Sequence, residues 1–345
     1  MKILHVMAGA AQGGAETAFA ELCVAQKRAG FDVHVACRQS GRDEALAAAG
    51  VPMTILPFGG IFDFKTKPAL RALIDDIKPA IVVTWMNRAA KKLPKGGTFK
   101  WIARLGGYYN LKYYKGVDQF VVNAPDIGRW METKGADPAK ITFIPNFAEM
   151  DAAAQPADRA ALNTPKDAFL FLTLGRLHTN KAFDTLLDAF ALVPDAYLWI
   201  AGEGPERPAL EAQIKALGLE SRVRLLGWRD DRWALLAACD AFVFPSRHEP
   251  FGNSFMQAWA AGRALVTTAS QGPSYYVQDG IDALVTPIDN VPSLAKAMER
   301  LRVDAPLRAA LAIKGQEHYA QAFDKNAILD QWRRLYATTA QLGKS

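Results

Sequence analysis

The chain has 345 residues, of which 50% are hydrophobic and 22% are charged, and its formal net charge is +6. This length suggests about two domains, and the composition excludes a disordered chain, because enough apolar surface is present to offset the entropy lost on ordering. Three widely spaced cysteines exclude a disulfide scaffold and are typical of a reducing compartment.

Short apolar runs bounded by Gly, Pro or charged residues recur along the chain, with amphipathic stretches between them. Strands are predicted over residues 3–7, 33–37, 81–85, 101–105, 120–123, 141–145, 169–174, 196–201, 223–226, 241–245, 264–267 and 283–287. Helices are predicted over residues 15–28, 67–77, 183–192, 208–216, 294–301 and about 327–341. The apolar runs are mostly continuous, as in strands buried on both faces of a parallel sheet. Their alternation with helices predicts βαβ units and an α/β fold.

Two sets of strands predict two sheets, and each set opens on an apolar strand, a glycine-bearing loop and a helix. Residues 150–167 are rich in Ala, Pro and Asp and have no apolar period, so we place the domain boundary there. We predict an N-terminal domain over residues 1–155 and a C-terminal domain over residues 156–326. The last helix, at about 327–341, is expected to pack back on the N-terminal domain.

Positive charge is concentrated in the first half of the chain. Residues 1–150 hold 20 Lys and Arg against 13 Asp and Glu, whereas the remainder holds 21 against 22. Residues 85–115 include eight basic residues, no acidic residue and seven aromatic residues. Basic and aromatic side chains favour the headgroup level of an anionic membrane, so we predict that this segment docks on one. The alternative is that Trp101 and some tyrosines are core residues and the lysines only keep the surface hydrated. Four lysines are expected to be unpaired, namely Lys91, Lys92, Lys95 and Lys100.

The loop Ala11-Gln-Gly-Gly-Ala-Glu16 follows the first predicted strand and opens a helix. Gly13 and Gly14 would let the backbone approach an anion at the N-terminus of that helix. The loop lacks the Gly-x-Gly-x-x-Gly and Gly-Lys-Ser/Thr patterns, which excludes a standard dinucleotide or P-loop site. A tight turn between strand and helix is the alternative interpretation.

The loop from Gly175 to Lys181 follows the first strand of the second half. Arg176 offers a planar fork of donors and Lys181 a mobile charge, and both could converge on a diphosphate. Alternatively, both are surface cations, and Thr179 or Asn180 caps the next helix.

The sequence Gly202-Glu203-Gly204-Pro follows another predicted strand. Open α/β sheets bind ligands at this end of their strands, and glycines there allow close approach. An ordinary Gly-Pro turn before a helix explains the same residues equally well.

The stretch 244–262 contains the most informative set of candidate functional residues. A strand ends at Phe244, a polar loop carries Glu249, and Gly252-Asn253-Ser254 is typical of a helix start. Gln257 lies within that helix, which is expected to end near Gly262. A carboxylate beside a helix N-terminus suits a ligand with sugar hydroxyls and phosphates. The alternative is that Glu249 only complements the helix dipole.

Taken in order, these motifs resemble glycosyltransferase family 4. They are Gly-Gly-Ala-Glu, Gly-Arg-x-x-x-x-Lys, Gly-Glu-Gly-Pro, and Pro-Ser-x-x-Glu-Pro-Phe-Gly followed by Ala-x-Ala-x-Gly. The resemblance covers nearly the whole chain and is strongest over residues 169–287. It implies the GT-B fold, with two Rossmann-like domains facing each other across a cleft. It also implies transfer from a nucleotide sugar, such as a UDP- or GDP-sugar, with retention of configuration and without a metal or other cofactor.

The resemblance further implies roles for individual residues. Arg176 and Lys181 would bind the donor diphosphate and Glu249 the donor-sugar hydroxyls, so these three are the expected catalytic residues. The expected donor-binding residues are Gly13, Gly14, Gly175, Gly202, Glu203, Gly204, Gly227, Trp228, Phe251, Gly252, Asn253, Ser254, Phe255 and Gln257. The family's cleft histidine has no clear match in the first domain. Asn87, Arg88 or the loop Gly106-Gly-Tyr-Tyr-Asn110 is expected to take its place. The expected acceptor or cleft residues are Asn87, Arg88, Arg104, Tyr108, Tyr109 and Asn110.

The chain departs from the family pattern at several positions. Gln257 stands where the family usually has a second glutamate that holds the ribose, and a neutral amide bonds a hydroxyl more weakly. Ala182 stands where a glycine usually follows the lysine. These departures leave the expected fold unchanged but affect the expected site.

We therefore expect a metal-independent, retaining hexosyltransferase with a glycan acceptor. The basic N-terminal domain points to an anionic lipid-linked glycan, such as lipopolysaccharide core or another envelope polysaccharide. The alternatives are a nucleotide-sugar epimerase of the same fold, a catalytically weak sugar-nucleotide-binding homologue, and a nucleic-acid-binding protein. No nucleic-acid-binding module is recognisable. Without a signal peptide or a run of about 18 apolar residues, we expect a cytoplasmic enzyme, peripheral on the inner face of the cytoplasmic membrane.

Overall fold

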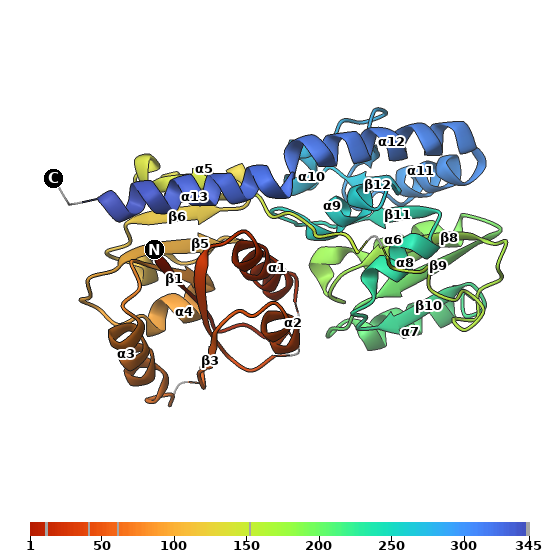
Figure 1. Cartoon of the computed structure of the whole chain (residues 1–345). Coiled ribbons are helices and arrows are strands. Elements are labelled where there is room, and N and C mark those ends of the chain that lie inside the picture. Colours follow the sequence, from red (N-terminus) through yellow and green to blue (C-terminus); the bar gives the residue numbers. More distant parts are fainter. Residues whose placement is uncertain (11–12, 41, 61, 152, 343–345) are drawn as a thin grey trace. The chain divides into compact units, whose positions relative to one another are not determined.

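The computed structural model describes the chain except for residues 11–12, 41, 61, 152 and 343–345 (Figure 1). Contacts divide the chain into two compact units. Unit 1 comprises Met1–Phe147 and Lys325–Ser345, and unit 2 comprises Ala148–Asp324. The division therefore lies somewhat before the expected boundary at 155/156. Each unit is an α/β domain built on a parallel sheet, which confirms the predicted fold class.

In the described part of unit 1, seven parallel strands form one sheet in the order β3-β2-β1-β4-β5-β6-β7. They are β1 (Lys2–Met7), β2 (Asp32–Cys37), β3 (Met53–Ile55), β4 (Ile81–Trp85), β5 (Lys100–Leu105), β6 (Gln119–Val122) and β7 (Ile141–Phe143). The edge strand β3 is absent from the sequence prediction. It has three residues, none of them buried, so it gives no continuous apolar run.

The helices of unit 1 include one from the far end of the chain. They are α1 (Gly14–Arg28), α2 (Asp43–Ala48), α3 (Thr66–Ile77), α4 (Met86–Lys92), α5 (Pro125–Thr133) and α13 (Lys325–Gln341). Single 3-10 turns cover Leu111–Tyr114 and Pro138–Lys140. The apolar face of α13, including Trp332 and Tyr336, belongs to the same buried cluster as Ile3 and Ile81 of the sheet. The last helix thus completes the core of the N-terminal unit.

A buried chain of hydrogen bonds ties α13 to the sheet of unit 1. Trp85 Nε1 donates to His5 Nδ1 at 3.1 Å, so the proton of the neutral His5 ring lies on Nε2. His5 Nε2 then donates to Gln26 Oε1 at 2.9 Å, and Gln26 Nε2 donates to the Tyr336 hydroxyl at 3.0 Å. Burial, partly offset by the bond to Gln26, lowers the pKa of His5 to about 4, so the ring is neutral at pH 7.

In the described part of unit 2, six parallel strands form one sheet in the order β10-β9-β8-β11-β12-β13. They are β8 (Phe169–Leu174), β9 (Ala196–Ala201), β10 (Val223–Gly227), β11 (Ala241–Phe244), β12 (Ala264–Thr268) and β13 (Leu284–Thr286). The helices are α6 (Phe183–Ala191), α7 (Arg207–Ala216), α8 (Arg232–Ala238), α9 (Asn253–Ala260), α10 (Gln271–Tyr276), α11 (Val291–Val303) and α12 (Ala305–Ala322), with a 3-10 turn at Thr179–Lys181.

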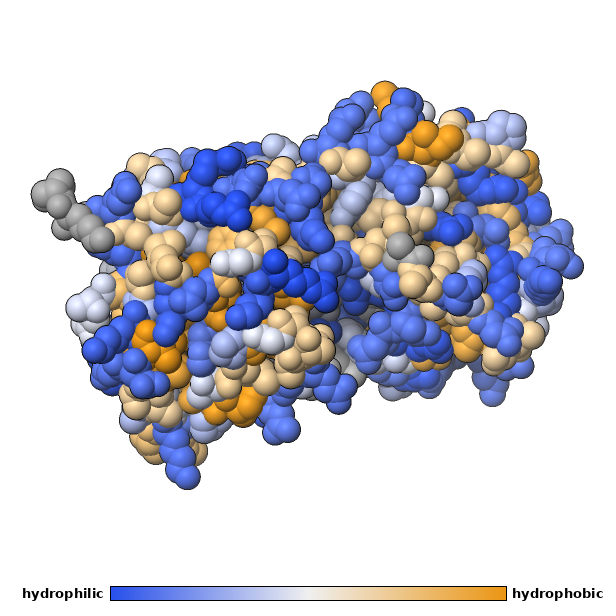
Figure 2. Space-filling view, viewed as in Figure 1, coloured by the Kyte–Doolittle hydropathy of each residue, from blue (hydrophilic) through white to orange (hydrophobic). Residues whose placement is uncertain are grey.

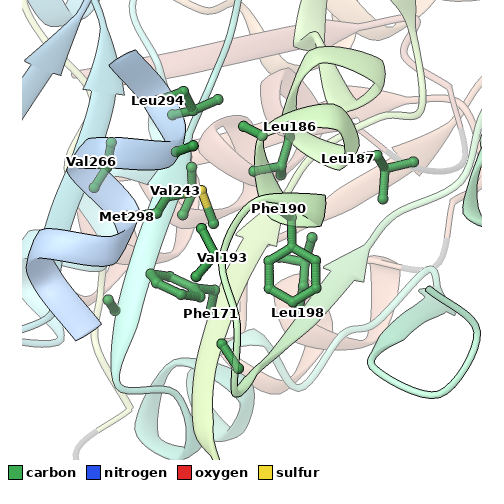
Figure 3. Close-up of a cluster of buried hydrophobic side chains, with 14 of the residues drawn as sticks. Phe171, Leu186, Leu187, Phe190, Val193, Leu198, Val243, Val266, Leu294 and Met298 are labelled. Atoms are coloured by element: carbon green, nitrogen blue, oxygen red, sulfur yellow. The ribbon is translucent and has the colours of Figure 1, made fainter. Parts of the chain in front are cut away.

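The core of unit 2 lies between the sheet and its helices (Figure 3). Phe171 of β8 and Val243 of β11 meet Phe190 of α6 and Met298 of α11 there. These side chains are almost completely buried, and burying each contributes about 1.5–3 kcal/mol. The packed centre of the sheet therefore gives the loops beyond its strands a rigid base.

On the face that Figure 2 shows, hydrophilic residues predominate and apolar residues form separate patches. Within the described residues, no helix is both long enough and apolar enough to cross a membrane.

Candidate functional site

The strand order of unit 2 identifies one place where a ligand is expected. The order reverses between β8 and β11, so the chain leaves these neighbouring strands in opposite directions. Open α/β sheets bind ligands beyond the carboxyl ends of the strands at such a reversal. The loop after β8 carries Arg176 and Lys181, and the loop after β11 carries Glu249. Residues predicted as catalytic thus lie on the two loops that flank the reversal.

Backbone hydrogen bonds join three loops at this end of the sheet. Gly175 N donates to Ala201 O at 3.0 Å, and Leu177 N donates to Glu203 O at 3.0 Å. Arg247 N donates to Asn180 O at 2.8 Å. The loops after β8, β9 and β11 therefore form one connected surface.

Gly202 and Gly204 allow two of these loops to pack against each other. A Cβ atom at Gly202 would lie 1.8 Å from Gly175 O, and one at Gly204 would lie 2.2 Å from Leu177 O. Both contacts are far shorter than a real Cβ contact, and both atoms belong to the backbone, which cannot move aside easily. The close approach that these glycines permit is therefore an approach of protein backbone to protein backbone.

Lys181 and Glu249 form an ion pair with each other. Their side chains are 21% and 17% exposed, so each charge is partly desolvated and held by the other. Lys181 Nζ also lies 5.5 Å from the centre of the Phe244 ring. Arg176 differs, because its side chain is exposed and forms no hydrogen bond or ion pair with any described residue. One cation of the predicted pair is thus already partnered and the other is available.

The backbone of Glu249 is fixed as well. Its N–H donates to Gln271 Oε1 at 3.2 Å, and its carbonyl accepts from Gly272 N at 2.8 Å. A Cβ at Gly272 would lie 2.1 Å from Phe251 O, so glycine is required for this approach. Residues at the start of α10 therefore hold the Glu249 loop in place.

Helix α9 begins where the sequence predicted, with Gly252 as its N-cap in a left-handed conformation (φ 99°). Phe251 and Phe255 are buried in an aromatic cluster with Tyr276, so their rings belong to the core. Asn253 and Ser254, in the first turn, are half-buried. Gln257 is buried one turn further on, and its side chain forms no hydrogen bond with any described residue.

Ala182 has the backbone conformation for which glycine is the usual residue, with φ 52° and ψ 38°. This explains why the family usually has glycine here, since a left-handed conformation costs other residues about 1–2 kcal/mol. Ala182 is also the N-cap of α6, so the alternative prediction that Thr179 or Asn180 caps that helix is wrong. The His178 side chain accepts from Asn180 N at 3.2 Å and caps the preceding 3-10 turn instead.

Arg247 is a residue that the sequence analysis missed. Its guanidinium spans Asp184 and Thr185 of α6, Asp289, and the carbonyl of Thr179. The distances are 2.9 and 2.7 Å to the two Asp184 oxygens, 2.7 Å to Asp289 Oδ1, 2.9 Å to Thr185 Oγ1 and 2.8 Å to Thr179 O. All five N–H donors of an arginine are thereby used. Because Arg247 lies two residues before Glu249, this clamp fixes the loop that carries the carboxylate.

The remaining predicted donor-binding residues of unit 2 lie around β9 and β10. The Gly227 carbonyl accepts from Gly202 N at 2.7 Å, which joins the ends of these strands. Glu203 pairs with Arg207 at 2.8 Å. Trp228 Nε1 donates to Asp230 at 2.9 Å.

In unit 1, the predicted glycine loop lies beside a carboxylate. Glu16 Oε1 accepts from Ala10 N at 2.8 Å, and a Cβ at Gly13 would lie 2.2 Å from Glu16 Oε2. Gly14 is the first residue of α1. Ala11 and Gln12 of this loop lie outside the described residues. The turn therefore holds the Glu16 side chain against its own backbone.

The predicted acceptor-side residues of unit 1 mostly have structural partners. They form the following contacts: Asn87 Oδ1 accepts from the Tyr114 hydroxyl at 2.8 Å, Arg88 donates to Ala8 O at 3.4 Å, Tyr108 donates to Asp126, and Asn110 accepts from Lys112 N at 3.1 Å. Arg104 is buried, donates to Leu105 O at 3.1 Å and to Asn146, and lies over the Trp85 ring. Tyr109 is half-buried, and burial raises the pKa of its hydroxyl.

Several aromatic residues and lysines of segment 85–115 are buried or paired and are therefore not available to a membrane surface. Trp85, Trp101 and Tyr114 are buried core residues. Lys92 pairs with Asp63 at 3.1 Å and Lys100 with Asp118 at 3.5 Å, so the expectation that both are unpaired is wrong. The acidic partners lie outside the segment in sequence, which is why the local charge count did not show them.

Comparison with known proteins agrees with this geometry. A model described as "Glycosyl transferases group 1" matches residues 154–318, and one described as "Glycosyltransferase Family 4" matches residues 12–152. The lipopolysaccharide core biosynthesis glycosyltransferase LpsD of Rhizobium meliloti (strain 1021) is 33% identical over 339 residues, 97% of this chain and 98% of that protein. LpsE of the same organism, described in the same words, is 38% identical over 263 residues, 76% of each protein.

Among solved structures, Anabaena Alr3699/HepE in complex with UDP and glucose has a TM-score of 0.85 at 21% identity. The match covers 98% of this chain and 100% of that one. At this identity the likeness shows a shared fold.

Proposed function

This chain belongs to glycosyltransferase family 4 and has the GT-B fold, and from that premise we propose that it moves a sugar from a UDP- or GDP-sugar to a lipopolysaccharide-core acceptor. The observation that carries the proposal is the placement of Arg176, Lys181 and Glu249 on the two loops flanking the strand reversal of unit 2. The relatives LpsD and LpsE, named for lipopolysaccharide core biosynthesis, support the choice of acceptor.

In this proposal, different residues of unit 2 bind different parts of the donor. Arg176 and Lys181 neutralise the diphosphate, Glu249 accepts from hydroxyls of the donor sugar, and Gln257 bonds the ribose. Lys181 then exchanges its bond with Glu249 for a bond with phosphate, and Glu249 turns to the sugar. Two preorganised cations beside the leaving diphosphate lower the barrier without a metal.

In this proposal, the anomeric configuration of the sugar is retained because the acceptor attacks on the face from which the phosphate leaves. The bond from C1 to the phosphate oxygen breaks, and the bond from C1 to the acceptor oxygen forms on the same face. The departing phosphate oxygen takes the acceptor proton. This route needs no protein nucleophile.

A thermal-shift screen against UDP-, GDP- and ADP-sugars tests the donor. At a ligand concentration 100 times its dissociation constant, the folded state gains about 2.7 kcal/mol, so the true donor raises the melting temperature. Transfer is then measured with the stabilising donor and a lipopolysaccharide-core acceptor. The proposal is rejected if no nucleotide sugar raises the melting temperature.

Gln257 favours a second candidate, a homologue that binds nucleotide sugars but turns them over weakly. The amide is buried and has no partner among the described residues, so it is available to a ribose but offers no charge. Gln257→Leu is expected to weaken nucleotide binding by about 1–3 kcal/mol, since the hydroxyl loses its bond. Gln257→Glu is expected to retain it. A large gain in turnover for Gln257→Glu would support the weak homologue.

The proposal places the enzyme at the inner face of the cytoplasmic membrane, where a lipid-linked acceptor is available. Exposed Lys91, Lys95, Lys112 and Lys115 support an anionic membrane contact through segment 85–115. Lys91 Nζ lies 4.1 Å from the centre of the Tyr113 ring, so an aromatic ring accompanies these cations.

A further inference from the structure

The two most exposed large apolar side chains in the described part of the chain are close neighbours in sequence. Phe62 is 83% exposed and Phe64 is 78% exposed. Both lie in the loop between β3, which ends at Ile55, and α3, which begins at Thr66 (Figure 1). Single exposed apolar residues are common, but a pair of exposed phenylalanines in one loop is a feature that calls for a partner.

The loop holds these rings outward by anchoring the residue between them. Asp63 points inward, where its carboxylate accepts from Thr66 N at 3.0 Å and Lys65 N at 3.2 Å. Lys92 of α4 pairs with the same carboxylate at 3.1 Å. The hydrogen bonds from Thr66, with the pairing to Lys92, hold the pKa of Asp63 well below its usual range.

The base of the loop is closed as well. Phe58 N donates to Thr66 Oγ1 at 2.8 Å, and the Phe58 ring is fully buried. The loop therefore starts and ends at fixed points, with Asp63 as a third. The exposure of Phe62 and Phe64 follows from this built arrangement.

Basic residues follow the two phenylalanines directly in the chain and at the start of α3. Lys65 is the N-cap of α3, and Lys67 and Arg71 lie on its first two turns. The Arg71 guanidinium donates to the carbonyls of Lys95 and Gly96, which brings Lys95 beside α3. We call Phe62, Phe64, Lys65, Lys67, Arg71 and Lys95 the aromatic loop patch. Asp75 and Asp76 lie at the other end of α3.

We propose that the aromatic loop patch docks unit 1 on an anionic bilayer, with Phe62 and Phe64 inserted at the headgroup level. Aromatic rings favour that level, and nearby Lys and Arg are attracted to anionic lipid. A stable peripheral contact needs two signals, and the patch supplies an apolar one and an electrostatic one. This inference deepens the proposed function and rests on it, because a lipid-linked acceptor lies at such a surface.

The composition of the patch favours lipid over a protein partner. A stable protein interface buries about 800 Å² on each side with a packed apolar centre. Two exposed rings followed by basic residues form no such surface, whereas anionic headgroups complement the positive charges without any fixed shape.

Vesicle co-sedimentation tests the proposal with the whole chain. The vesicles are phosphatidylcholine alone, or phosphatidylcholine with about 30% phosphatidylglycerol, the probe that supplies negative charge. The wild type is expected to bind the anionic vesicles and not the neutral ones. Phe62→Ser with Phe64→Ser is expected to lower the partition coefficient about tenfold or more, because two apolar rings no longer leave water.

Leu192→Ser with Ile313→Ser is the matched control. These residues of unit 2 are 62% and 57% exposed, so the change also removes two exposed apolar side chains. It is expected to leave vesicle binding unchanged. Lys65→Gln with Lys67→Gln is expected to weaken binding and reduce its salt dependence, since fewer charges meet the lipid.

Three outcomes overturn the proposal: no binding of the wild type to anionic vesicles, equal binding of the wild type and the double serine variant, or an equal loss in the control. Sedimentation velocity without lipid tests whether a second copy of this chain, and not a bilayer, binds the aromatic loop patch. A dimer that the double serine variant abolishes would make a second copy of this chain the partner. Nucleotide-sugar thermal shifts are measured on all variants. If they persist while vesicle binding is absent, this inference and the proposed membrane contact of segment 85–115 fail, and the proposed sugar transfer stands.

Discussion

Arg247→Ala is expected to destabilise unit 2 and weaken donor binding, although Arg247 carries no expected contact with the donor. The side chain joins the loop of Glu249 to α6 and Asp289 through five acceptors. Arg247, Asp184 and Asp289 are 28%, 52% and 47% exposed, so solvent screens both ion pairs. Each such pair contributes about 0.2–1 kcal/mol, and each neutral bond about 0.5–1.5 kcal/mol.

Together, these contributions predict that Arg247→Ala lowers the free energy of unfolding by about 2–3 kcal/mol. For a domain of this size, that lowers the melting temperature by about 4–12 °C. Arg247→Lys keeps the charge but loses the fork, so an intermediate loss is expected. Because the Glu249 loop is then less restricted, the KM for the nucleotide sugar is expected to rise about tenfold in Arg247→Ala.

Arg302→Ala is the matched control for this prediction. Arg302 also lies in unit 2 and forms a two-bond pair with Glu299 three residues away, at 2.8 and 2.7 Å, within one helix. Loss of this pair is expected to lower the free energy of unfolding by about 0.3–1 kcal/mol and to leave the KM unchanged. Differential scanning calorimetry and initial-rate kinetics measure both quantities. A melting temperature of Arg247→Ala within about 1 °C of the wild type, or an equal rise of the KM in Arg302→Ala, would contradict this role of Arg247.

Three further changes test other features. Arg176→Ala is expected to leave the melting temperature unchanged, because the guanidinium has no bond with any described residue, and to lower transfer by about 10²–10³; near-normal turnover in an activity assay would remove Arg176 from the donor site. Gly204→Ala is expected to destabilise the fold by about 1–3 kcal/mol, since its Cβ would lie 2.2 Å from Leu177 O; an unchanged denaturant midpoint would contradict that packing. The pKa of His5 is lowered from 6.5 to about 4, so between these pH values the unfolded chain binds a proton that the folded chain does not. Stability from His5 is thus fully present above about pH 6.5 and falls by about 1.4 kcal/mol per unit as the pH drops to about 4. Denaturant midpoints of the wild type and His5→Asn from pH 4 to 8 measure this difference, and parallel curves would count against it.

Most of the fold could be predicted from the sequence because its strands are buried on both faces and read as continuous apolar runs. Helix α12, over Ala305–Ala322, was missed although it is long. Its buried residues are Leu311 and Gly315, so its sequence has no apolar stripe to detect. Short elements such as α2 and β3 were missed for the same reason, because too few of their residues are buried to form a pattern.

The loops of the site could be located by their glycines, but the contacts between loops could not. The ion pair of Lys181 and Glu249 joins residues 68 positions apart, and its formation depends on β8 lying beside β11. The Arg247 clamp depends on the same strand order. The glycines at 202 and 204 could be read as places for a ligand, but the backbone of the neighbouring loop fills that space.

The origin of α13 has a consequence for how the chain is made. Unit 2 is one continuous stretch, Ala148–Asp324, whereas unit 1 needs residues from both ends of the chain. At about 5–20 residues per second, translation of unit 2 delays the last helix by roughly 10–35 s. During that time the nascent N-terminal unit lacks the Tyr336 hydroxyl to which Gln26 donates, and it exposes the apolar surface that Trp332 and Tyr336 later cover. The second unit can therefore complete its folding on the ribosome before the first, and the first needs protection until α13 has been synthesised.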